Sequence, residues 1–141
     1  MQRNLLFYKL AQIGLSFKFL RMLRAMYEKT LVCIKDGYKI SEFFETLFGI
    51  KQGDNASPLM FSLFIDDLKD VLLGGVDFAG TRIKLLMYAD DIVLIAKTPD
   101  ALQLMINRLE SYCDKWKLNV NLDKSKVMIF RNGFGRYARN E

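Results

Sequence analysis

Two adjacent aspartates interrupt an apolar run in the second half of the chain. Asp90 and Asp91 stand between Leu85–Tyr88 and Ile92–Ile95, two stretches with the composition of core strands. Carboxylates this close repel each other, and one stays protonated unless a cation lies beside them. Hard oxygen ligands of this kind suit Mg²⁺. The alternative interpretation is a polar turn without a chemical role, because aspartate is a favoured turn residue.

The composition narrows the chemistry that such a pair could take part in. Histidine is absent, which excludes histidine-based triads, histidine-ligated zinc and the commonest general base. Any catalysis would depend on carboxylates, lysines and bound metal. The two cysteines, Cys33 and Cys113, match no metal-ligand spacing and lie in apolar patterns. We therefore expect buried free thiols in a reducing, intracellular compartment.

The charge pattern permits binding to nucleic acid without requiring it. The formal net charge is +5, a moderate excess that can neutralise phosphates. Positive residues gather after Trp116, at Lys117, Lys124, Lys126, Arg131, Arg136 and Arg139. The apolar runs are broken by charge before they reach the roughly 20 residues that span a bilayer. We expect no membrane segment and no signal peptide.

The first half of the chain predicts helices followed by a hairpin. Asn4–Ile13 and Phe17–Lys29 have helical patterns broken at Gly14, and Ser16 can cap the second helix. Asp36-Gly37 between the alternating runs of Thr30–Phe44 is a strong hairpin signal.

A glycine-containing loop then leads into a third helix. Ser57 as N-cap and Pro58 at the first helical position predict a helix that runs to Leu73 and stops at Gly74-Gly75. We expect its apolar residues Leu59, Phe61, Leu63 and Phe64 to face the core. Asp66 and Asp67 are expected to form a polar face.

Strands over Arg82–Tyr88 and Ile92–Ala96 must hold the aspartate pair at a turn. Thr98-Pro99 opens another helix, and Lys126–Phe130 is predicted to be a strand. The tight turns predict one α+β domain: a largely antiparallel sheet with helices packed on one face. The expected segments are 1–29 (helical lead-in), 30–48 (hairpin), 49–73 (loop and helix), 82–96 (aspartate hairpin), 98–130 (helix and strand) and 131–141 (frayed tail).

Three motifs in order give the pattern a family resemblance. Tyr88–Asp91 (Tyr-Ala-Asp-Asp) resembles the Tyr-x-Asp-Asp motif of reverse transcriptases. Lys51–Phe61 resembles the family's Gln-Gly-x-x-x-Ser-Pro loop and helix, and Trp116–Lys126 resembles its Asn-x-x-Lys-Ser/Thr turn. Phe64–Leu68 is closer to retrotransposon enzymes than to retroviral ones. The chain is identified as a truncated palm-domain fragment of a non-LTR retrotransposon reverse transcriptase.

The resemblance implies a two-metal polymerase site. In this family two Mg²⁺ ions, for which Mn²⁺ can substitute, bridge three carboxylates and the phosphates of the incoming nucleotide. Asp90 would be the principal metal ligand and Asp91 the secondary one. Lys124 would protonate the leaving pyrophosphate, with Lys126 as a competitor for that role. Taken alone, a lysine such as Lys124 is more often a solvated turn residue.

The resemblance also implies partners. Gln52, Gly53 and Tyr88 would lie beside the nucleotide and template, and glycine would let the backbone approach a base closely. The partners would be an RNA template, a DNA primer and deoxynucleoside triphosphates. Gly53 could instead only shape the turn before the helix.

The family's third carboxylate lies on a strand just before a helix that resembles Arg3–Leu6. Because the chain starts at Met1, we expect that palm strand, the fingers and the thumb to come from a full-length parent. The isolated chain would then be inactive. The alternative is a non-catalytic remnant that serves as a nucleic-acid-binding or protein-interaction module.

Overall fold

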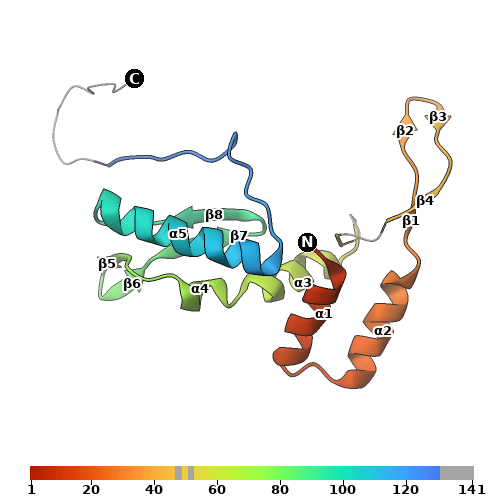
Figure 1. The fold of residues 1–141 in the computed structure, drawn as a ribbon, viewed down its shortest axis with the longest axis horizontal. Coiled ribbons are helices and arrows are strands. Elements are labelled where there is room, and N and C mark those ends of the chain that lie inside the picture. The colour runs from red at the N-terminus through yellow and green to blue at the C-terminus, as the bar shows by residue number, and fades with distance from the viewer. Residues whose placement is uncertain (47–48, 51–52, 131–141) are drawn as a thin grey trace.

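A computed structural model describes residues 1–46, 49–50 and 53–130 (Figure 1). The helices in these ranges are α1 (Arg3–Gln12), α2 (Phe17–Glu28), α3 (Ala56–Ile65), α4 (Leu68–Val71) and α5 (Pro99–Trp116). The strands are β1 (Leu31–Val32), β2 (Lys35–Asp36), β3 (Lys39–Ile40), β4 (Phe44–Glu45), β5 (Val76–Phe78), β6 (Thr81–Ile83), β7 (Leu85–Tyr88) and β8 (Asp91–Leu94). The predicted mixture of helices and antiparallel strands is confirmed.

Helices α1 and α2 lie side by side and are joined by a short turn (Figure 1). Gly14 in this turn has a φ of 95°, a conformation that glycine adopts without a steric penalty. Ser16 caps α2 as predicted, since its Oγ accepts a hydrogen bond of 3.3 Å from the backbone N–H of Phe19. Both helices end within a residue of their predicted bounds.

The predicted hairpin after α2 is confirmed and forms an arm that extends away from the helices (Figure 1). Strand β1 pairs with β4, and β2 pairs with β3. Asp36 lies opposite Lys39, so Gly37 and Tyr38 form the tip. The Tyr38 side chain is fully exposed.

The predicted helix over Pro58–Leu73 differs from the structure at its start and in its middle. Helix α3 begins earlier because Asp54, a preferred helix-start residue, accepts a hydrogen bond of 3.1 Å from Ala56 N–H. Ser57 is therefore not the cap: it is buried, and its Oγ lies 3.3 Å from the Tyr27 hydroxyl. Pro58 still falls in the first turn, where it lacks only an N–H that has no helical partner.

A turn at Asp66-Asp67 separates α3 from α4 and ends the predicted continuous helix. Asp67 in this turn forms an ion pair with Lys9 of α1. Phe64 is buried as predicted, and Phe61 and Leu63 are half-buried. Leu59 is 63% exposed, so its predicted place in the core is wrong.

Two tight hairpins follow α4. The predicted strand Arg82–Tyr88 is divided at Lys84 into β6, which pairs with β5, and β7, which pairs with β8. Lys84 Nζ donates a hydrogen bond of 2.9 Å to the carbonyl of Leu72, which anchors this division to the end of α4. Gly75 lets the chain pass close to β6, because a Cβ there would lie 2.7 Å from the Ile83 carbonyl oxygen.

Among the described residues, the strands form four separate two-stranded sheets. The prediction of one antiparallel sheet with helices on one face is therefore not met in this arrangement. The predicted strand Lys126–Phe130 is also wrong, since this segment has no ladder partner and its side chains are exposed. A strand requires a neighbour for its backbone N–H and C=O groups, and apolar alternation alone does not supply one.

The core lies between the helices. The buried apolar side chains that form it are Leu6, Phe7, Leu10, Leu23, Tyr27, Met60, Phe64, Ile65, Leu68, Leu72, Met105, Tyr112 and Trp116. Both cysteines are free thiols, as predicted. Cys113 is buried as predicted, whereas Cys33 is only half-buried. In the described part of the chain, no helix has the length and apolarity needed to cross a bilayer.

Candidate active site

The β7–β8 hairpin presents the aspartate pair at its tip. Tyr88 lies opposite Asp91, which leaves Ala89 and Asp90 as the two loop residues. Both carboxylates are exposed, as the interruption of the apolar run predicted. Ala89 has a φ of 53°, a left-handed conformation that an L-residue adopts at a cost.

The alternation of side chains gives the hairpin two different faces. Leu85, Ile92 and Leu94 are half-buried and pack against the helical core. The opposite face carries Leu86, Tyr88, Asp91 and Val93, which are all exposed. The tip is thus held by an apolar inner face, while Asp91 shares the outer face with the 85% exposed Tyr88 ring.

Asp90 and Asp91 fit the requirements for ligands of a hard divalent cation. They offer carboxylate oxygens from consecutive residues, on a hairpin anchored by packing and open to approach from solvent. Within the described ranges, no group of three or more acidic, cysteine or histidine residues could hold a metal ion. The described part of the site therefore contributes two carboxylates.

The remaining predicted site residues lie on other segments. Gln52 falls outside the described residues. Gly53 has a φ of 80° and immediately precedes Asp54, whose side chain receives the first N–H of α3. Gly53 therefore lies in the turn before the helix, in a conformation that favours glycine.

Lys124 lies in an exposed turn after α5. The backbone N–H of Lys124 donates to Asn121 Oδ1 over 3.2 Å, and the Ser125 hydroxyl donates to the Asn121 carbonyl over 2.8 Å. Lys126 Nζ donates to the Asp123 carbonyl over 3.0 Å. Among the described residues, no hydrogen bond or ion pair joins this turn to the aspartate hairpin. The hairpin alone therefore brings Tyr88, Asp90 and Asp91 together.

A buried lysine is the main polar feature that the sequence pattern did not indicate. Lys9 of α1 is only 4% exposed, and its Nζ lies 2.5 Å from Asp67 Oδ1 and 2.6 Å from the Tyr112 hydroxyl. It also donates to the carbonyl of Phe64 over 2.5 Å. The Tyr112 hydroxyl donates in turn to Asp67 over 2.6 Å. We call Lys9, Asp67 and Tyr112 the Lys9 cluster.

Aromatic rings surround the ammonium group of the Lys9 cluster. Lys9 Nζ lies 4.0 Å from the centroid of Trp116, and 4.7 and 4.6 Å from those of Phe64 and Tyr112. Burial lowers the pKa of Lys9, and the hydrogen bond and charge of Asp67 oppose this shift. Burial and the neighbouring Asp67 hold the pKa of Tyr112 far above its usual range.

One feature of the sequence could have indicated the Lys9 cluster, namely the position of the lysine. Lys9 lies on the same helical face as Leu6 and Leu10, so a lysine there must be buried, with a partner for its charge. Its partners are 58 and 103 residues away in sequence and could not be identified from local patterns. The cluster links α1 to the α3–α4 turn and to α5.

Comparison of the sequence with known protein families gives one match over most of the chain. The family described as "Reverse transcriptase (RNA-dependent DNA polymerase)" matches residues 4–137. These residues include the aspartate hairpin, the loop before α3 and the Lys124 turn.

Similar proteins come from mobile genetic elements of insects. The chain is 33% identical over 91 residues, or 63% of its length, to the "Retrovirus-related Pol polyprotein from type-2 retrotransposable element R2DM" of Drosophila melanogaster. It is 37% identical over 65 residues, or 45% of its length, to the Pol polyprotein from "type-1 retrotransposable element R2" of Nasonia vitripennis. It is 27% identical over 137 residues, or 90% of its length, to the "RNA-directed DNA polymerase from mobile element jockey" of Drosophila funebris.

The chain spans 8%, 6% and 14% of the lengths of these three relatives, respectively. The matched residues nevertheless cover nearly the whole of the chain itself. The resemblance indicated by the three motifs is confirmed, and the chain belongs to the reverse transcriptase family, with retrotransposon enzymes as its relatives.

Proposed function

We propose that the chain is the part of an RNA-directed DNA polymerase that carries two of its metal-binding carboxylates. The reaction is the transfer of a nucleotide from a deoxynucleoside triphosphate to a DNA primer paired with an RNA template. One observation carries the proposal: Asp90 and Asp91 lie exposed at the tip of a packed hairpin, in a chain matched by the reverse transcriptase family.

The two aspartates are the proposed ligands of a divalent cation, Mg²⁺ or its substitute Mn²⁺. Held by these carboxylates in a two-metal arrangement, divalent ions would supply activation of the primer 3′-hydroxyl and charge stabilisation of the departing pyrophosphate. Asp90, in the loop, is the principal ligand. Asp91, held in β8 opposite Tyr88, is the secondary one.

Three further residues have proposed roles next to the nucleotide. Tyr88 offers an exposed ring on the same face as Asp91. Gly53, together with Gln52, contacts the nucleotide and template from the loop before α3. Lys124, whose side chain is exposed, donates a proton to pyrophosphate.

An exchange experiment tests the function. The matched segment of 137 residues in the jockey polymerase of Drosophila funebris is replaced by the present chain. Primer extension is then measured on an RNA template with Mg²⁺ and with Mn²⁺. We expect extension by the chimera and its loss to background with Asp90→Asn or Asp91→Asn.

The matched control is Asp100→Asn, because Asp100 is an exposed carboxylate in the first turn of α5, away from the hairpin tip. This variant should extend primers at the rate of the unmodified chimera. Extension that survives Asp90→Asn would refute the proposed ligand role. A folded chimera that extends no primer would favour the non-catalytic alternative.

A further inference from the structure

A groove between α1 and α2 is lined by unneutralised arginines. The groove has a volume of about 700 Å³, and its polar lining comes from Gln2, Arg3, Asn4, Arg21, Arg24 and Glu28. Three arginines thus face one glutamate. Within the described ranges, none of the three arginines forms an ion pair. The groove therefore carries excess positive charge.

The structure holds two of these arginines in place. Arg3 donates from Nε to the Gly49 carbonyl and from Nη1 to the Tyr27 carbonyl, each over 3.0 Å. Its remaining N–H groups stay available as donors. The Arg24 guanidinium lies 5.4 Å from the centroid of the Phe7 ring, which orients it over the groove wall. Arginines ordered in advance lose little conformational entropy when they bind an anion.

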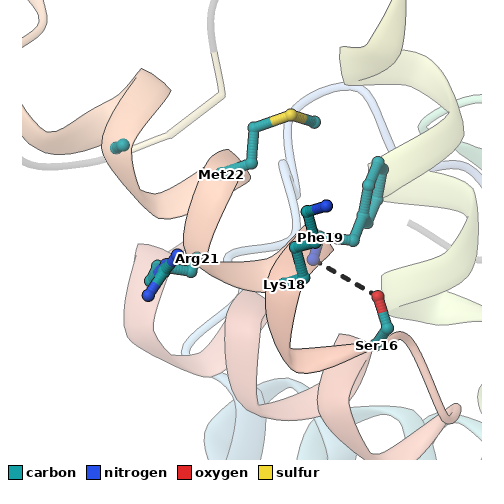
Figure 2. A pocket seen from close by; sticks show the side chains of 6 residues that line it. Ser16, Lys18, Phe19, Arg21 and Met22 are labelled. Atoms are coloured by element: carbon teal, nitrogen blue, oxygen red, sulfur yellow. Dashed lines mark hydrogen bonds between the residues drawn. The ribbon is translucent and has the colours of Figure 1, made fainter.

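The charged surface continues along α2 into a second hollow. This hollow of about 520 Å³ is lined by Lys18, Phe19 and Met22, and it shares Arg21 and Ala25 with the groove. Figure 2 shows Lys18 and Arg21 on successive turns of the helix, with Phe19 pointing away from Arg21. Among the described residues, no acidic side chain lines this hollow.

The spacing of the cations fits a linear polyanion. Lys18, Arg21 and Arg24 follow one another at intervals of three residues, so they span about 9 Å along the helix axis. At about 3.4 Å per nucleotide, this length matches two to three successive phosphates of a stacked strand. The exposed Phe17 and Phe19 rings lie beside these cations in sequence and offer surfaces on which bases can stack.

We propose that the groove between α1 and α2 binds the phosphodiester backbone of a single-stranded nucleic acid. The groove is concave and lies between two helices, which suits a strand better than the flat surface of a membrane. Its lining comes from α1 and α2 without any residue of β7 or β8. The inference therefore does not depend on the metal-binding role of Asp90 and Asp91.

The test measures binding of the purified chain to a fluorescein-labelled oligouridine of about 20 nucleotides, longer than one binding site. Fluorescence anisotropy is recorded from about 50 mM salt upwards. In the double variant Arg21→Gln/Arg24→Gln, we expect affinity to fall roughly fiftyfold at the lowest salt. The slope of log affinity against log salt should decrease by about 1.4, because each lost phosphate contact contributes about 0.7 on a single strand.

The control removes the same charge elsewhere. Lys35→Gln/Lys39→Gln takes two exposed cations from the β2–β3 arm, and it should change affinity less than about twofold. Arg21→Lys/Arg24→Lys keeps the charge and should restore most of the binding. Arg21→Glu reverses the charge of a single groove residue. It should leave the fold intact, because Arg21 makes no hydrogen bond or ion pair within the described ranges. Asp90→Asn should bind as the parent chain does.

Two further ligands separate the sources of the phosphate chemistry. An oligothymidine DNA of equal length tests whether the backbone alone suffices, and binding to either strand that depends on the arginines supports the proposal. Vesicles containing phosphatidylserine test the membrane alternative. Equal binding of RNA by the groove and arm variants would overturn the inference. So would arginine-dependent binding to the vesicles without arginine-dependent binding to either strand.

Discussion

At the scale of single residues, the Lys9 cluster is the most unusual feature of the core. A buried ammonium group is tolerated only when hydrogen bonds and an opposite charge replace its water. Lys9 satisfies this condition with a carboxylate, a hydroxyl and a carbonyl, and three rings add cation–π attraction. Asp67 is about half exposed, so one end of the cluster remains in contact with water.

Loss of the Lys9 side chain should destabilise the fold. Lys9→Ala empties the space between the rings of Phe64, Tyr112 and Trp116 and removes the lysine hydrogen bond to the Phe64 carbonyl, which keeps the 3.3 Å bond from the Tyr112 hydroxyl. We expect the free energy of unfolding to fall by about 3 kcal/mol in urea melts. Lys115→Ala is the control, because Lys115 is exposed and its side chain lies over the Trp116 ring and forms no hydrogen bond or ion pair among the described residues. Equal losses in the two variants would mean that Lys9 is not buried as described.

The hydroxyl of Tyr112 should make stability depend on pH in the alkaline range. The pKa of Tyr112 is raised by burial and by Asp67, whereas an unfolded tyrosine ionises near pH 10. Above that pH the unfolded chain releases a proton that the native chain keeps, so the Tyr112 contribution to stability falls as pH rises. Lys9 has the opposite sign: its lowered pKa makes the native chain lose a proton first, and its contribution rises towards pH 10.5.

Tyr112→Phe isolates the falling contribution. At pH 8 the variant should be about 2 kcal/mol less stable than the parent chain, because hydrogen bonds to charged groups are lost. The difference should narrow by up to about 1.4 kcal/mol per pH unit above pH 10. The measurement is a series of urea melts between pH 8 and 11.5. Tyr38→Phe is the control for the loss of a tyrosine hydroxyl, because the Tyr38 ring is fully exposed.

At the scale of elements, local turn signals predicted the hairpins, and contacts between distant segments changed the helices. Ala89 and Asp90 form the loop of one predicted hairpin. Gly37 lies in the loop of the other, and Asp36 immediately precedes that loop. The break at Asp66-Asp67 was not predicted from the helical pattern, and it coincides with an ion pair between Asp67 and a residue 58 positions away. The N-cap of α3 is Asn55, where Ser57 was predicted, and the Asp54 side chain accepts the N–H of Ala56.

The loop of the aspartate hairpin contains a strained residue. Ala89 has a φ of 53°, where an L-residue loses roughly 1–2 kcal/mol relative to right-handed conformations and glycine does not. Ala89→Gly should therefore raise the free energy of unfolding by about 0.5–1 kcal/mol, after the larger entropy of unfolded glycine is subtracted.

Thermal and urea melts of two alanine-to-glycine variants test this point. Ala101→Gly is the matched control, since Ala101 lies in the first turn of α5 and the same substitution should destabilise a helix by up to about 1 kcal/mol. Opposite signs are expected for the two variants. Destabilisation by both would show that the tip is not held in the left-handed conformation.

At the scale of the whole molecule, the order of helices and hairpins was predictable, and the way the hairpins pair into sheets was not. The order of helices and hairpins followed from periodicity, caps and turns. The sequence did not predict the β5–β6 hairpin, which has Ala79-Gly80 between its strands, because Arg82 and Ile83 run without a turn signal into Leu85–Tyr88 and read as part of one strand. Whether neighbouring hairpins join into one sheet depends on edge-to-edge contacts that no local pattern specifies, and here they remain four separate pairs.

The candidate site also has one part that the sequence predicts and one part that it does not. The exposure of Asp90 and Asp91 was predictable, because two charges inside an apolar run can be accommodated only at a solvent-facing turn. The position of Lys124 was not predictable, since the segment after α5 forms no ladder in the described residues and its turn is held by local hydrogen bonds to Asn121, Leu122 and Asp123.

Exposed apolar surface on the aspartate hairpin should cause the purified chain to self-associate. Leu86, Tyr88 and Val93 form a continuous outer face on β7–β8, and both strands have an edge without a ladder partner among the described residues. Contiguous apolar faces and open strand edges promote pairing with another chain. Sedimentation velocity should therefore show a weight-average mass that rises with concentration.

Leu86→Lys/Val93→Lys should return the chain towards the monomer without lowering its melting temperature, because neither side chain contributes to the core. Leu104→Lys introduces a charge at a similarly exposed position on α5 and should leave association unchanged. A chain that stays monomeric at every concentration would contradict the prediction.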